Sequence, residues 1–378
     1  MEEGASEVWL CPLCVLMIAT SAAVLLLWGR GGRSAGLMVV GVLLCCVIPA
    51  GCFILALLSV GYTVIHCTAG RQELLLSAQG KSVLITGCDS GFGHNLAKLL
   101  DRAGVKVYAG VLKENGAGAQ ELRRVSSPQL TVLQLDITDT NQISKTLQFI
   151  KSQTGETGLW GLVNNAGVTG FVCDAEILPL RILRKILDVN FIAGVEMTLA
   201  FLPLIRQTKG RIVNVSSVGG EVPFPGFAAY GSSKAALTAY SGVLRQELSQ
   251  WGVKVAIIQP GCFRTNILGN EEEWSKIEKE ILSSLIQEVR EAYGEEYICS
   301  LQRRLSALTT AGSTDTTPVL DAITHALFAE RPRGFYRPGP SAVSLSLLHM
   351  FCPTWLFDLV FSKITRYNRV KPAGVVSK

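Results

Sequence analysis

The sequence lacks the usual features of nucleic-acid-binding and metal-binding proteins. It has no run of basic residues, and its formal net charge of +5 is spread over 378 residues. Its four histidines are His66, His94, His325 and His349. They are scattered, and the zinc-like spacing of Cys11 and Cys14 has no second pair to complete a site. We therefore expect neither a nucleic-acid partner nor a bound metal.

Regularly spaced cysteines are also lacking. Six of the eleven cysteines lie in or beside two apolar runs within the first 70 residues. The other five are Cys88, Cys173, Cys262, Cys299 and Cys352. An odd number without regular spacing does not suit a disulfide framework, so the sequence predicts a reducing compartment.

Charged residues are scarce, and two segments have none at all. They make up 17% of the chain, against 48% hydrophobic residues, and none occurs in residues 8–28 or 34–70. The first segment has the ~20 residues that a helix needs to cross a bilayer, and its length and acidic flank do not fit a cleaved signal peptide. Arg30 and Arg33 follow it, which predicts a lumenal N-terminus and a cytosolic loop.

The second charge-free segment fits two membrane arrangements. Its 37 residues are too many for one straight span and slightly too few for two. One span with an interfacial continuation would put the rest of the chain in the lumen, whereas a hairpin bent near Pro49 and Gly51 would return it to the cytosol. We favour the hairpin because it keeps Arg71 and Lys81 on the cytosolic side. A buried core hairpin of a soluble protein is the remaining alternative.

Beyond residue 80 the pattern changes to short apolar runs separated by helical stretches. The runs cover residues 81–87, 105–112, 130–136, 159–165, 210–217 and 253–261. Such runs suit strands buried on both faces, and their alternation with helices predicts an α/β fold, a Rossmann-like doubly wound parallel sheet with helices on both faces. We place this domain at residues 80–335, after an N-terminal membrane anchor (1–70) and before a C-terminal apolar or lid segment (336–378).

Two further segments are expected to be helical. Residues 271–308 carry charged and aromatic residues at helical spacing, which predicts an amphipathic helix inserted after the sixth strand. Residues 341–361 are apolar but are interrupted by His349, Pro353 and Asp358. We interpret them as a helix pair that rests on the membrane or covers a substrate pocket, with a true span as the alternative.

Three glycines and a Tyr–Lys pair are candidate functional residues. Gly87, Gly91 and Gly93 lie between the first strand and the following helix. Glycine there lets the backbone approach a pyrophosphate at the helix N-terminus. Tyr230 and Lys234 are four residues apart, so they share a helix face and the ammonium can lie beside the phenol. Either pattern alone also fits an ordinary turn or helix.

Taken together, these residues resemble the motifs of the short-chain dehydrogenase/reductase family. The matching stretches are TGCDSGFG (86–93), NNAG (164–167), VNF (189–191), the S-x12-Y-x3-K pattern of Ser217, Tyr230 and Lys234, and PG (260–261). They occur in the family's order. On these matches the chain is identified as a member of the family.

The resemblance implies a role for each matched residue. Tyr230 is expected to be the general base for alcohol oxidation, and Lys234 to favour its phenolate and to hold the nicotinamide ribose. Ser217 is expected to bind the substrate oxygen, and Asn190 to organise a water beside Lys234. The cofactor-binding residues are expected to be Gly87, Ser90, Gly91, Phe92, Gly93, Asp136, Asn164, Ala166, Gly167, Pro260, Gly261 and Thr265, together with Tyr230 and Lys234.

The cofactor is expected to be NAD, with NADP as the alternative. The resemblance places Asp136 near the adenine and Thr265 at the nicotinamide carboxamide. A phosphate on the adenosine ribose usually requires a basic residue in the glycine loop or after the second strand. Ser90 occupies the loop position, and Lys113 is the candidate at the second.

Within the family, the chain is most similar to membrane-bound steroid and retinol dehydrogenases. This similarity implies NAD-dependent oxidation of 17β-hydroxysteroids (estradiol, testosterone) to 17-ketosteroids at the endoplasmic reticulum membrane, with the catalytic domain in the cytosol. An 11β-hydroxysteroid or retinol is the alternative substrate, because pocket shape decides. An inactive binding or scaffold protein on the same fold is the remote alternative. The expected partners are a steroid, the lipid bilayer and a second copy of the chain, since relatives often form dimers through the helix that carries Tyr230.

Overall fold

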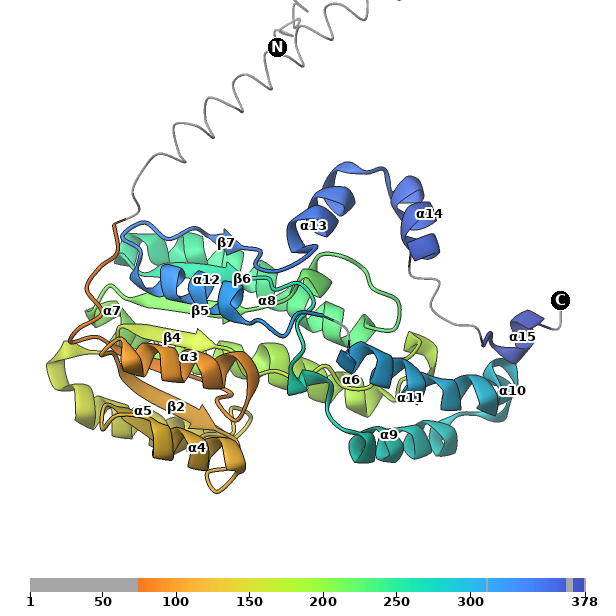
Figure 1. Ribbon diagram of the computed structural model, residues 1–378, viewed down its shortest axis with the longest axis horizontal. Helices are drawn as coiled ribbons and strands as arrows, with labels where there is room; N and C mark the ends of the chain where they lie inside the picture. Colours follow the sequence, from red (N-terminus) through yellow and green to blue (C-terminus); the bar gives the residue numbers. More distant parts are fainter. Residues whose placement is uncertain (1–73, 311, 365–369, 377–378) are drawn as a thin grey trace, which may run out of the picture. The chain divides into compact units, whose positions relative to one another are not determined.

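A computed structural model describes residues 74–310, 312–364 and 370–376. The expected membrane anchor, residues 1–70, lies outside these residues. The described part is built on a seven-stranded parallel sheet (Figure 1). Its strands are β1 (Ser82–Ile85), β2 (Lys106–Val111), β3 (Leu130–Gln134), β4 (Gly161–Asn164), β5 (Arg211–Val215), β6 (Lys254–Ile258) and β7 (Phe335–Tyr336). They are hydrogen-bonded in the order β3-β2-β1-β4-β5-β6-β7.

Six of these strands fall inside the six predicted runs. The central strands β1, β4 and β5 are buried along their whole length, as expected for strands covered on both faces. The seventh strand, β7, was not predicted, because a two-residue strand leaves no periodic pattern in the sequence. It is held by β6, where Ile257 N donates to Gly334 O (2.9 Å) and Gln259 N donates to Tyr336 O (2.8 Å).

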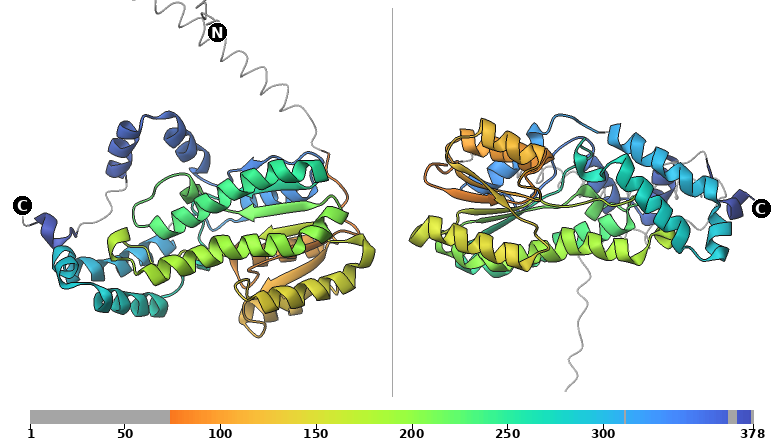
Figure 2. Two further views of the ribbon diagram at one scale, coloured as in Figure 1. Left: turned by 180° about the vertical axis from the view of Figure 1, so that it is seen from behind. Right: turned by 90° about the horizontal axis from the view of Figure 1, so that it is seen from below.

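Helices cover both faces of the sheet (Figure 2). One face carries α3 (Gly91–Arg102), α4 (Ala117–Val125) and α12 (Thr317–Phe328), and the other carries α5 (Thr140–Thr154), α7 (Ala193–Gln207) and α8 (Ala228–Glu247). Each layer has its own core cluster, with Leu100 and Ile323 in the first and Met197 and Phe201 in the second. The predicted doubly wound fold is therefore confirmed.

The longest apolar helix of the described residues belongs to this folded domain. Helix α6 (Leu180–Leu187) continues through a π-helical turn (Asp188–Ile192) into α7. By length and composition alone, Leu180–Gln207 could cross a membrane. Met197 and Phe201 are fully buried against the sheet, however. We therefore assign the segment to the core of the domain.

The insertion after β6 differs from the prediction. The sequence predicts one amphipathic helix over residues 271–308, whereas the structure has α9 (Glu271–Ser284), α10 (Gln287–Tyr293) and α11 (Glu295–Thr310). Gly294, with φ +78°, separates α10 from α11, and extended backbone at Leu285 and Ile286 separates α9 from α10. These breaks allow Trp274 and Ile298 to pack into one cluster.

The C-terminal segment contains the expected helix pair. It consists of α13 (Ala342–Phe351) and α14 (Thr354–Ile364), and α15 (Ala373–Val376) follows. Pro353 separates the pair, because it cannot continue a helix and it keeps the preceding residue, Cys352, extended. Phe357 and Phe361 pack against Val218 and Val222, which follow β5.

The order of the sheet determines where a ligand can bind. Neighbouring strands β1 and β4 lead into helices on opposite faces, and ligands of such folds bind at this point, outside the carboxyl ends of the strands. Gly87 follows β1, Ala166 follows β4, Ser217 follows β5 and Pro260 follows β6. The predicted site residues therefore meet at one edge of the sheet.

Candidate active site

The turn between β1 and α3 packs closely against the segment after β4. Gly87 has φ +70°, and a Cβ there would lie 2.8 Å from Cα of Ala166. A Cβ on Gly93 would lie 2.5 Å from both Asn165 Nδ2 and Gly87 O. Asn165 Nδ2 donates to the carbonyl oxygens of Thr86 (2.8 Å) and Gly87 (3.2 Å). Glycine is required at both positions, and the first amides of α3 lie at the edge where a pyrophosphate can bind, so these residues fit a dinucleotide.

The chain after β6 lies against the same turn. Phe263 packs edge-on against Phe92, with ring centroids 5.5 Å apart. The Thr265 side chain lies 3.6 Å from the position that a Cβ on Gly91 would take. Ser90 precedes α3 in an extended conformation and makes no side-chain cap to that helix. The structure thus brings Ser90, Gly91, Phe92 and Thr265 together, and their contact with a cofactor remains a prediction.

Two predicted cofactor residues have framework contacts instead. The side chain of Asn164 is buried and donates to Asn214 Oδ1 on the neighbouring strand (2.8 Å). Asp136 closes the turn after β3 by accepting a hydrogen bond from Thr138 N (2.9 Å). Asn164 therefore stabilises the sheet, and contact of either side chain with the cofactor remains a prediction.

Tyr230 and Lys234 lie one turn apart on α8, beside Ser217 at the end of β5. Lys234 Nζ lies 5.9 Å from the centroid of the Tyr230 ring and donates to the carbonyl of Val215 (2.9 Å). Lys234 is 2% exposed, and burial lowers its pKa to about 8. Burial raises the pKa of Tyr230, and a hydrogen bond with Ser217 opposes that rise in part. The sequence led us to expect a more acidic phenol, whereas in the folded chain desolvation outweighs the opposing hydrogen bond.

Asn190 projects from the π-helical turn between α6 and α7. Its Oδ1 accepts from Val168 N (2.8 Å), and its Nδ2 donates to Val168 O (2.8 Å) and Ser233 Oγ (2.9 Å). A Cβ on Gly167 would lie 3.1 Å from Asn190 Oδ1 and 3.2 Å from Lys234 Nζ. Asn190 thus holds the backbone after β4 close to Lys234, and its binding of a water there remains a prediction.

Asp89 was not among the residues predicted from the sequence. For the choice between NAD and NADP, only its neighbour Ser90 was considered in the glycine loop. Asp89 Oδ2 accepts from Leu112 N (2.8 Å), and Oδ1 accepts from Lys113 N (3.1 Å). The carboxylate therefore lies at the carboxyl end of β2, where dinucleotide-binding folds place an acid against the adenosine ribose. The only signal in the sequence was its place in the glycine loop, because its partners lie 23 and 24 residues further on.

Aromatic side chains from separate segments gather beside Tyr230. Phe227 packs edge-on against the Tyr230 ring, with centroids 6.2 Å apart. Phe224 contacts both Phe227 (6.3 Å) and Phe361 of α14 (5.4 Å). One side of the site is therefore an apolar wall that α14 helps to build.

Polar contacts tie the segment after β5 to the C-terminal region. Arg337 donates to both carboxylate oxygens of Glu221 (3.2 and 3.0 Å), and Ser346 of α13 donates to the same carboxylate (3.1 Å). Pro260 O accepts from Val218 N (3.1 Å), which joins the ends of β5 and β6. These bonds fix the position of the residues that immediately follow Ser217.

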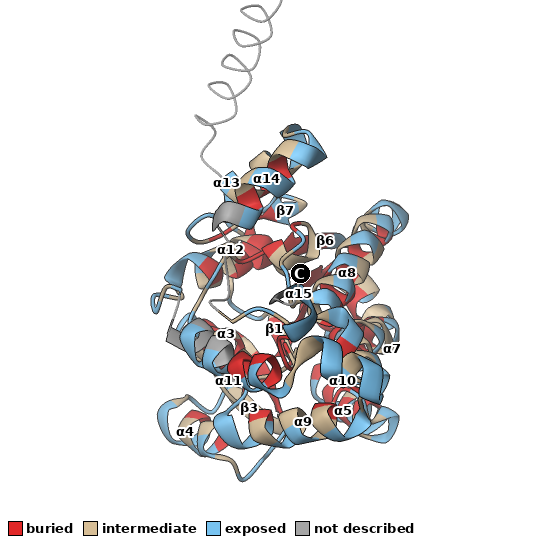
Figure 3. Ribbon diagram, turned by 90° about the vertical axis from the view of Figure 1, so that its right-hand side faces the viewer, coloured by how far each residue is buried: buried red, intermediate tan, exposed pale blue. Residues whose placement is uncertain are grey.

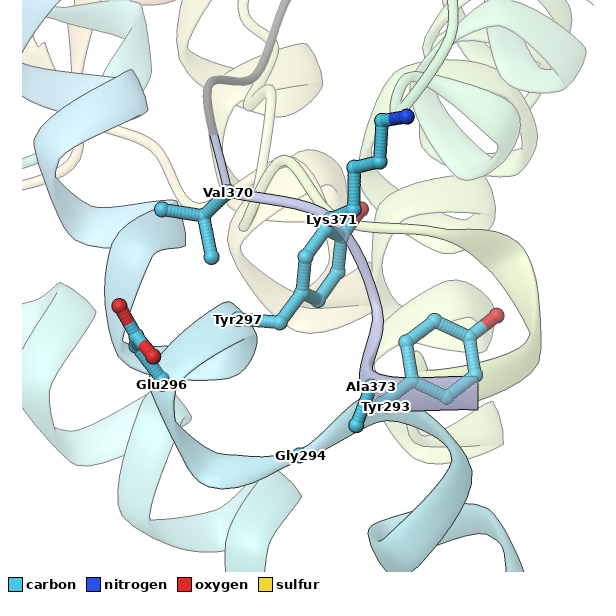
Figure 4. Close-up of a pocket in the computed structure, with 7 residues that line it drawn as sticks. All are labelled: Tyr293, Gly294, Glu296, Tyr297, Val370, Lys371 and Ala373. Carbon is cyan, nitrogen blue, oxygen red and sulfur yellow. The ribbon is translucent and has the colours of Figure 1, made fainter. Parts of the chain in front are cut away.

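A cavity of about 370 Å³ lies where α10, α11 and α15 meet (Figure 4). It is lined by Tyr293, Gly294, Glu296, Tyr297, Val370, Lys371 and Ala373. None of these belongs to the catalytic set, and the hydroxyls of Tyr293 and Tyr297 are bound to Glu176 and Asp174. We assign no ligand to this cavity.

The parallel sheet, the glycine turn at its switch point, and a Ser, Tyr and Lys at its carboxyl edge define a nicotinamide-dependent oxidoreductase with a Rossmann-like fold. The comparisons agree with this class. The chain belongs to the short-chain dehydrogenase family, whose model, described as short chain dehydrogenase, matches residues 81–276.

Curated relatives include several dehydrogenases of apolar alcohols. Mouse estradiol 17-beta-dehydrogenase 2 is 46% identical over 309 residues, which cover 82% of this chain and 81% of that protein. Human 11-beta-hydroxysteroid dehydrogenase type 2 is 47% identical over 276 residues (73% and 68%), and rat retinol dehydrogenase 16 is 42% identical over 291 residues (77% and 90%). These relatives support a steroid dehydrogenase activity.

Solved structures of the family have the same fold. A short-chain dehydrogenase from Streptomyces avermitilis is 27% identical, with a TM-score of 0.58, over 76% of this chain and 98% of its own. A short chain dehydrogenase from Burkholderia cenocepacia J2315 is 22% identical, with a TM-score of 0.55, over 75% and 99%. The second likeness bears on the fold alone.

Proposed function

We propose that this protein is a membrane-bound enzyme that oxidises 17β-hydroxysteroids, such as estradiol and testosterone, to 17-ketosteroids with NAD as hydride acceptor. The observation that carries the proposal is the grouping of Ser217, Tyr230 and the buried Lys234 at the carboxyl edge of the sheet, beside an apolar wall. The similarity to mouse estradiol 17-beta-dehydrogenase 2 over 82% of the chain supports the choice of the 17β-hydroxyl.

The proposed reaction separates a proton from a hydride. Tyr230 accepts the proton of the substrate hydroxyl, while Ser217 donates a hydrogen bond to the same oxygen. Burial keeps the pKa of Tyr230 above its ordinary value, so the phenol needs positive charge nearby to ionise. Lys234 supplies one charge. When bound, oxidised NAD would supply a second charge, in its ring, and the acceptor for the hydride of the carbinol carbon, so that the alcohol becomes a ketone.

The charge of Asp89 favours NAD over NADP. Its carboxylate, bound to the N–H groups of Leu112 and Lys113, would repel a phosphate on the adenosine ribose. The Lys113 side chain is a cation in the same region, so NADP is the second candidate.

The proposed location is the endoplasmic reticulum membrane, with the catalytic domain in the cytosol. The charge-free residues 8–28 and 34–70 support a lipid partner, and a steroid dissolves in the same bilayer.

A homodimer through α7 and α8 is also proposed. It is supported by exposed apolar residues on these helices, such as Leu199 (59%) and Val243 (57%).

The experiment that tests the chemistry is Tyr230→Phe, assayed in membranes with estradiol and NAD. We expect kcat to fall about a thousandfold, because the proton acceptor is lost, with little change in NAD affinity. Tyr240, which is half-buried on the same helix, provides the control: Tyr240→Phe should keep its turnover. Normal turnover by Tyr230→Phe would show that another group takes the proton.

A substrate panel tests the choice of hydroxyl. Membranes that contain the protein are offered NAD or NADP with 17β-, 11β- and 3α-hydroxysteroids and retinol. We expect the highest kcat/KM for a 17β-hydroxysteroid with NAD. The 11β-hydroxysteroids and retinol are the second candidates because of the relatives named above, and a preference for either would overturn the proposed substrate.

A further inference from the structure

The helix pair α13–α14 has two apolar faces, and the rest of the described chain covers only one of them. The inner face packs on the segment after β5 through residues such as Phe357 and Phe361. The outer face carries Val343, Leu347, Met350, Phe351, Trp355 and Leu359, each 48–76% exposed. We call these six residues the outer apolar face. Figure 3 shows how much of α13 and α14 is exposed.

The outer apolar face has the regular spacing of a docking surface. On α13 its members Val343, Leu347, Met350 and Phe351 stand at i, i+4, i+7 and i+8, so they form one stripe along the helix. The ten residues of α13 include no Asp, Glu, Lys or Arg. A surface helix of a soluble domain carries polar residues on its outer side, so a contiguous apolar stripe there marks a contact surface.

We propose that the outer apolar face docks into the interfacial layer of a lipid bilayer. A ten-residue helix is ~15 Å long, half of the ~30 Å hydrocarbon core, so α13 lies along the membrane and does not cross it. Trp355 suits the headgroup level, and the exposed carboxylate of Asp358 beside it can remain in water there.

The rest of the chain favours lipid over a protein occupant. Charge-free runs of 21 and 37 residues precede the described region, and each is long enough to hold the chain at a bilayer. A tethered domain meets that bilayer at a high effective concentration, so even a shallow apolar contact is occupied.

This docking places the membrane next to the active site. The inner face of α14 contacts Phe224 through Phe361, and Phe224 contacts Phe227 beside Tyr230. The helix pair that docks therefore belongs to the same set of apolar contacts as Tyr230. The proposal rests on the proposed function for the membrane anchor and for the identity of the alcohol.

The test uses the full-length protein in phosphatidylcholine vesicles with brominated acyl chains, which quench nearby tryptophans. The difference between the wild type and Trp355→Phe isolates the emission of Trp355. We expect this emission to be quenched by brominated lipid and protected from aqueous iodide. The control is Trp251→Phe, because Trp251 is also half-exposed (50%) but stacks under Arg206, outside the helix pair. Its emission should respond to iodide and not to brominated lipid.

Two outcomes would overturn the proposal. Quenching of Trp355 by iodide and not by brominated lipid would leave the outer apolar face in water. Quenching by neither would mean that protein covers it, either a second copy or the N-terminal residues. Phe351→Trp adds a probe at the most exposed position of the face (76%) and should behave like Trp355. The measurement needs no turnover, so a failure of steroid oxidation with lipid quenching intact would count against the proposed function alone.

Discussion

At the scale of single residues, the burial of Lys234 opposes the positive charge that its proposed role requires. It is almost fully buried, and its ammonium donates to the carbonyl of Val215. Burial disfavours the charged form and lowers its pKa from 10.5 to about 8. The folded chain retains the ammonium below that pH, where the proposed chemistry needs a positive charge beside Tyr230.

The lowered pKa of Lys234 predicts how the free energy of unfolding depends on pH. Below pH 8 the buried ammonium destabilises the folded chain by about 3 kcal/mol. Between pH 8 and 10.5 the folded chain releases the proton before the unfolded chain does, so the penalty shrinks as pH rises. Between about pH 7.5 and 9.5, we expect the free energy of unfolding of the wild type to rise by about 2 kcal/mol relative to that of Lys234→Met.

Urea unfolding of both proteins without cofactor, at these two pH values, measures the effect. Titrating groups that are distant from Lys234 cancel in the difference between the two proteins. Parallel pH dependences would contradict the lowered pKa of Lys234. The variant should also lose turnover.

Asp89 is a second residue whose charge has a measurable consequence. Asp89→Asn keeps the size of the side chain and an acceptor for Leu112 N but removes the charge. We expect the ratio of kcat/KM with NADP to that with NAD to rise about tenfold, because repulsion of the ribose phosphate is relieved. Lys113→Ser should shift the same ratio downward. An unchanged ratio in Asp89→Asn would show that Asp89 does not select the cofactor.

At the scale of elements, the glycine turn between β1 and α3 depends on contacts with the segment after β4. Gly93→Ala places a methyl group 2.5 Å from Gly87 O, which cannot yield without moving the turn. We expect a loss of about 1–3 kcal/mol in the free energy of unfolding and weaker dinucleotide binding. Chemical denaturation and a binding titration measure the two effects.

Gly242 on α8 is the matched control for this substitution. A Cβ there would have no heavy atom within 4 Å, so Gly242→Ala should stabilise the protein by up to about 1 kcal/mol through helix propensity. If both substitutions had the same effect, the close approach at Gly93 would not determine the turn.

At the scale of the whole molecule, the ion pair of Arg337 and Glu221 joins β7, the segment after Ser217 and helix α13. The two side chains are 27% and 19% exposed, so Arg337→Gln leaves a largely buried carboxylate without its cation. We expect a cost of about 1–2 kcal/mol in the free energy of unfolding and faster proteolysis before α13.

Arg290→Gln is the control for this pair. Arg290 and Glu295 form an ion pair in which both side chains are well exposed, at 48% and 62%, and its loss should cost at most about 0.5 kcal/mol. Equal losses in the two variants would mean that the Arg337 pair does not hold the helix pair in place.

The sheet, and the edge of it at which the candidate site residues meet, were predictable for a physical reason. Strands buried on both faces must be apolar throughout, so six of them left recognisable runs. Gly87 and Tyr230 were recognisable because they stand within a set of motifs that resembles a known family, since the glycine turn or the helical spacing alone is not specific. In contrast, β7 is too short to show a pattern, and the division of residues 271–308 into three helices depends on Gly294 and on tertiary packing.

The sequence by itself determined the local chemistry: the apolar runs, the glycine turn, and the spacing that puts Tyr230 and Lys234 on one helix face. Only the tertiary structure decided that Asp89 reaches the end of β2, that burial raises the pKa of Tyr230, and that α13 turns an apolar stripe outward. Hydrogen-bond partners, desolvation and exposure are set by residues distant in the chain, so no local pattern contains them.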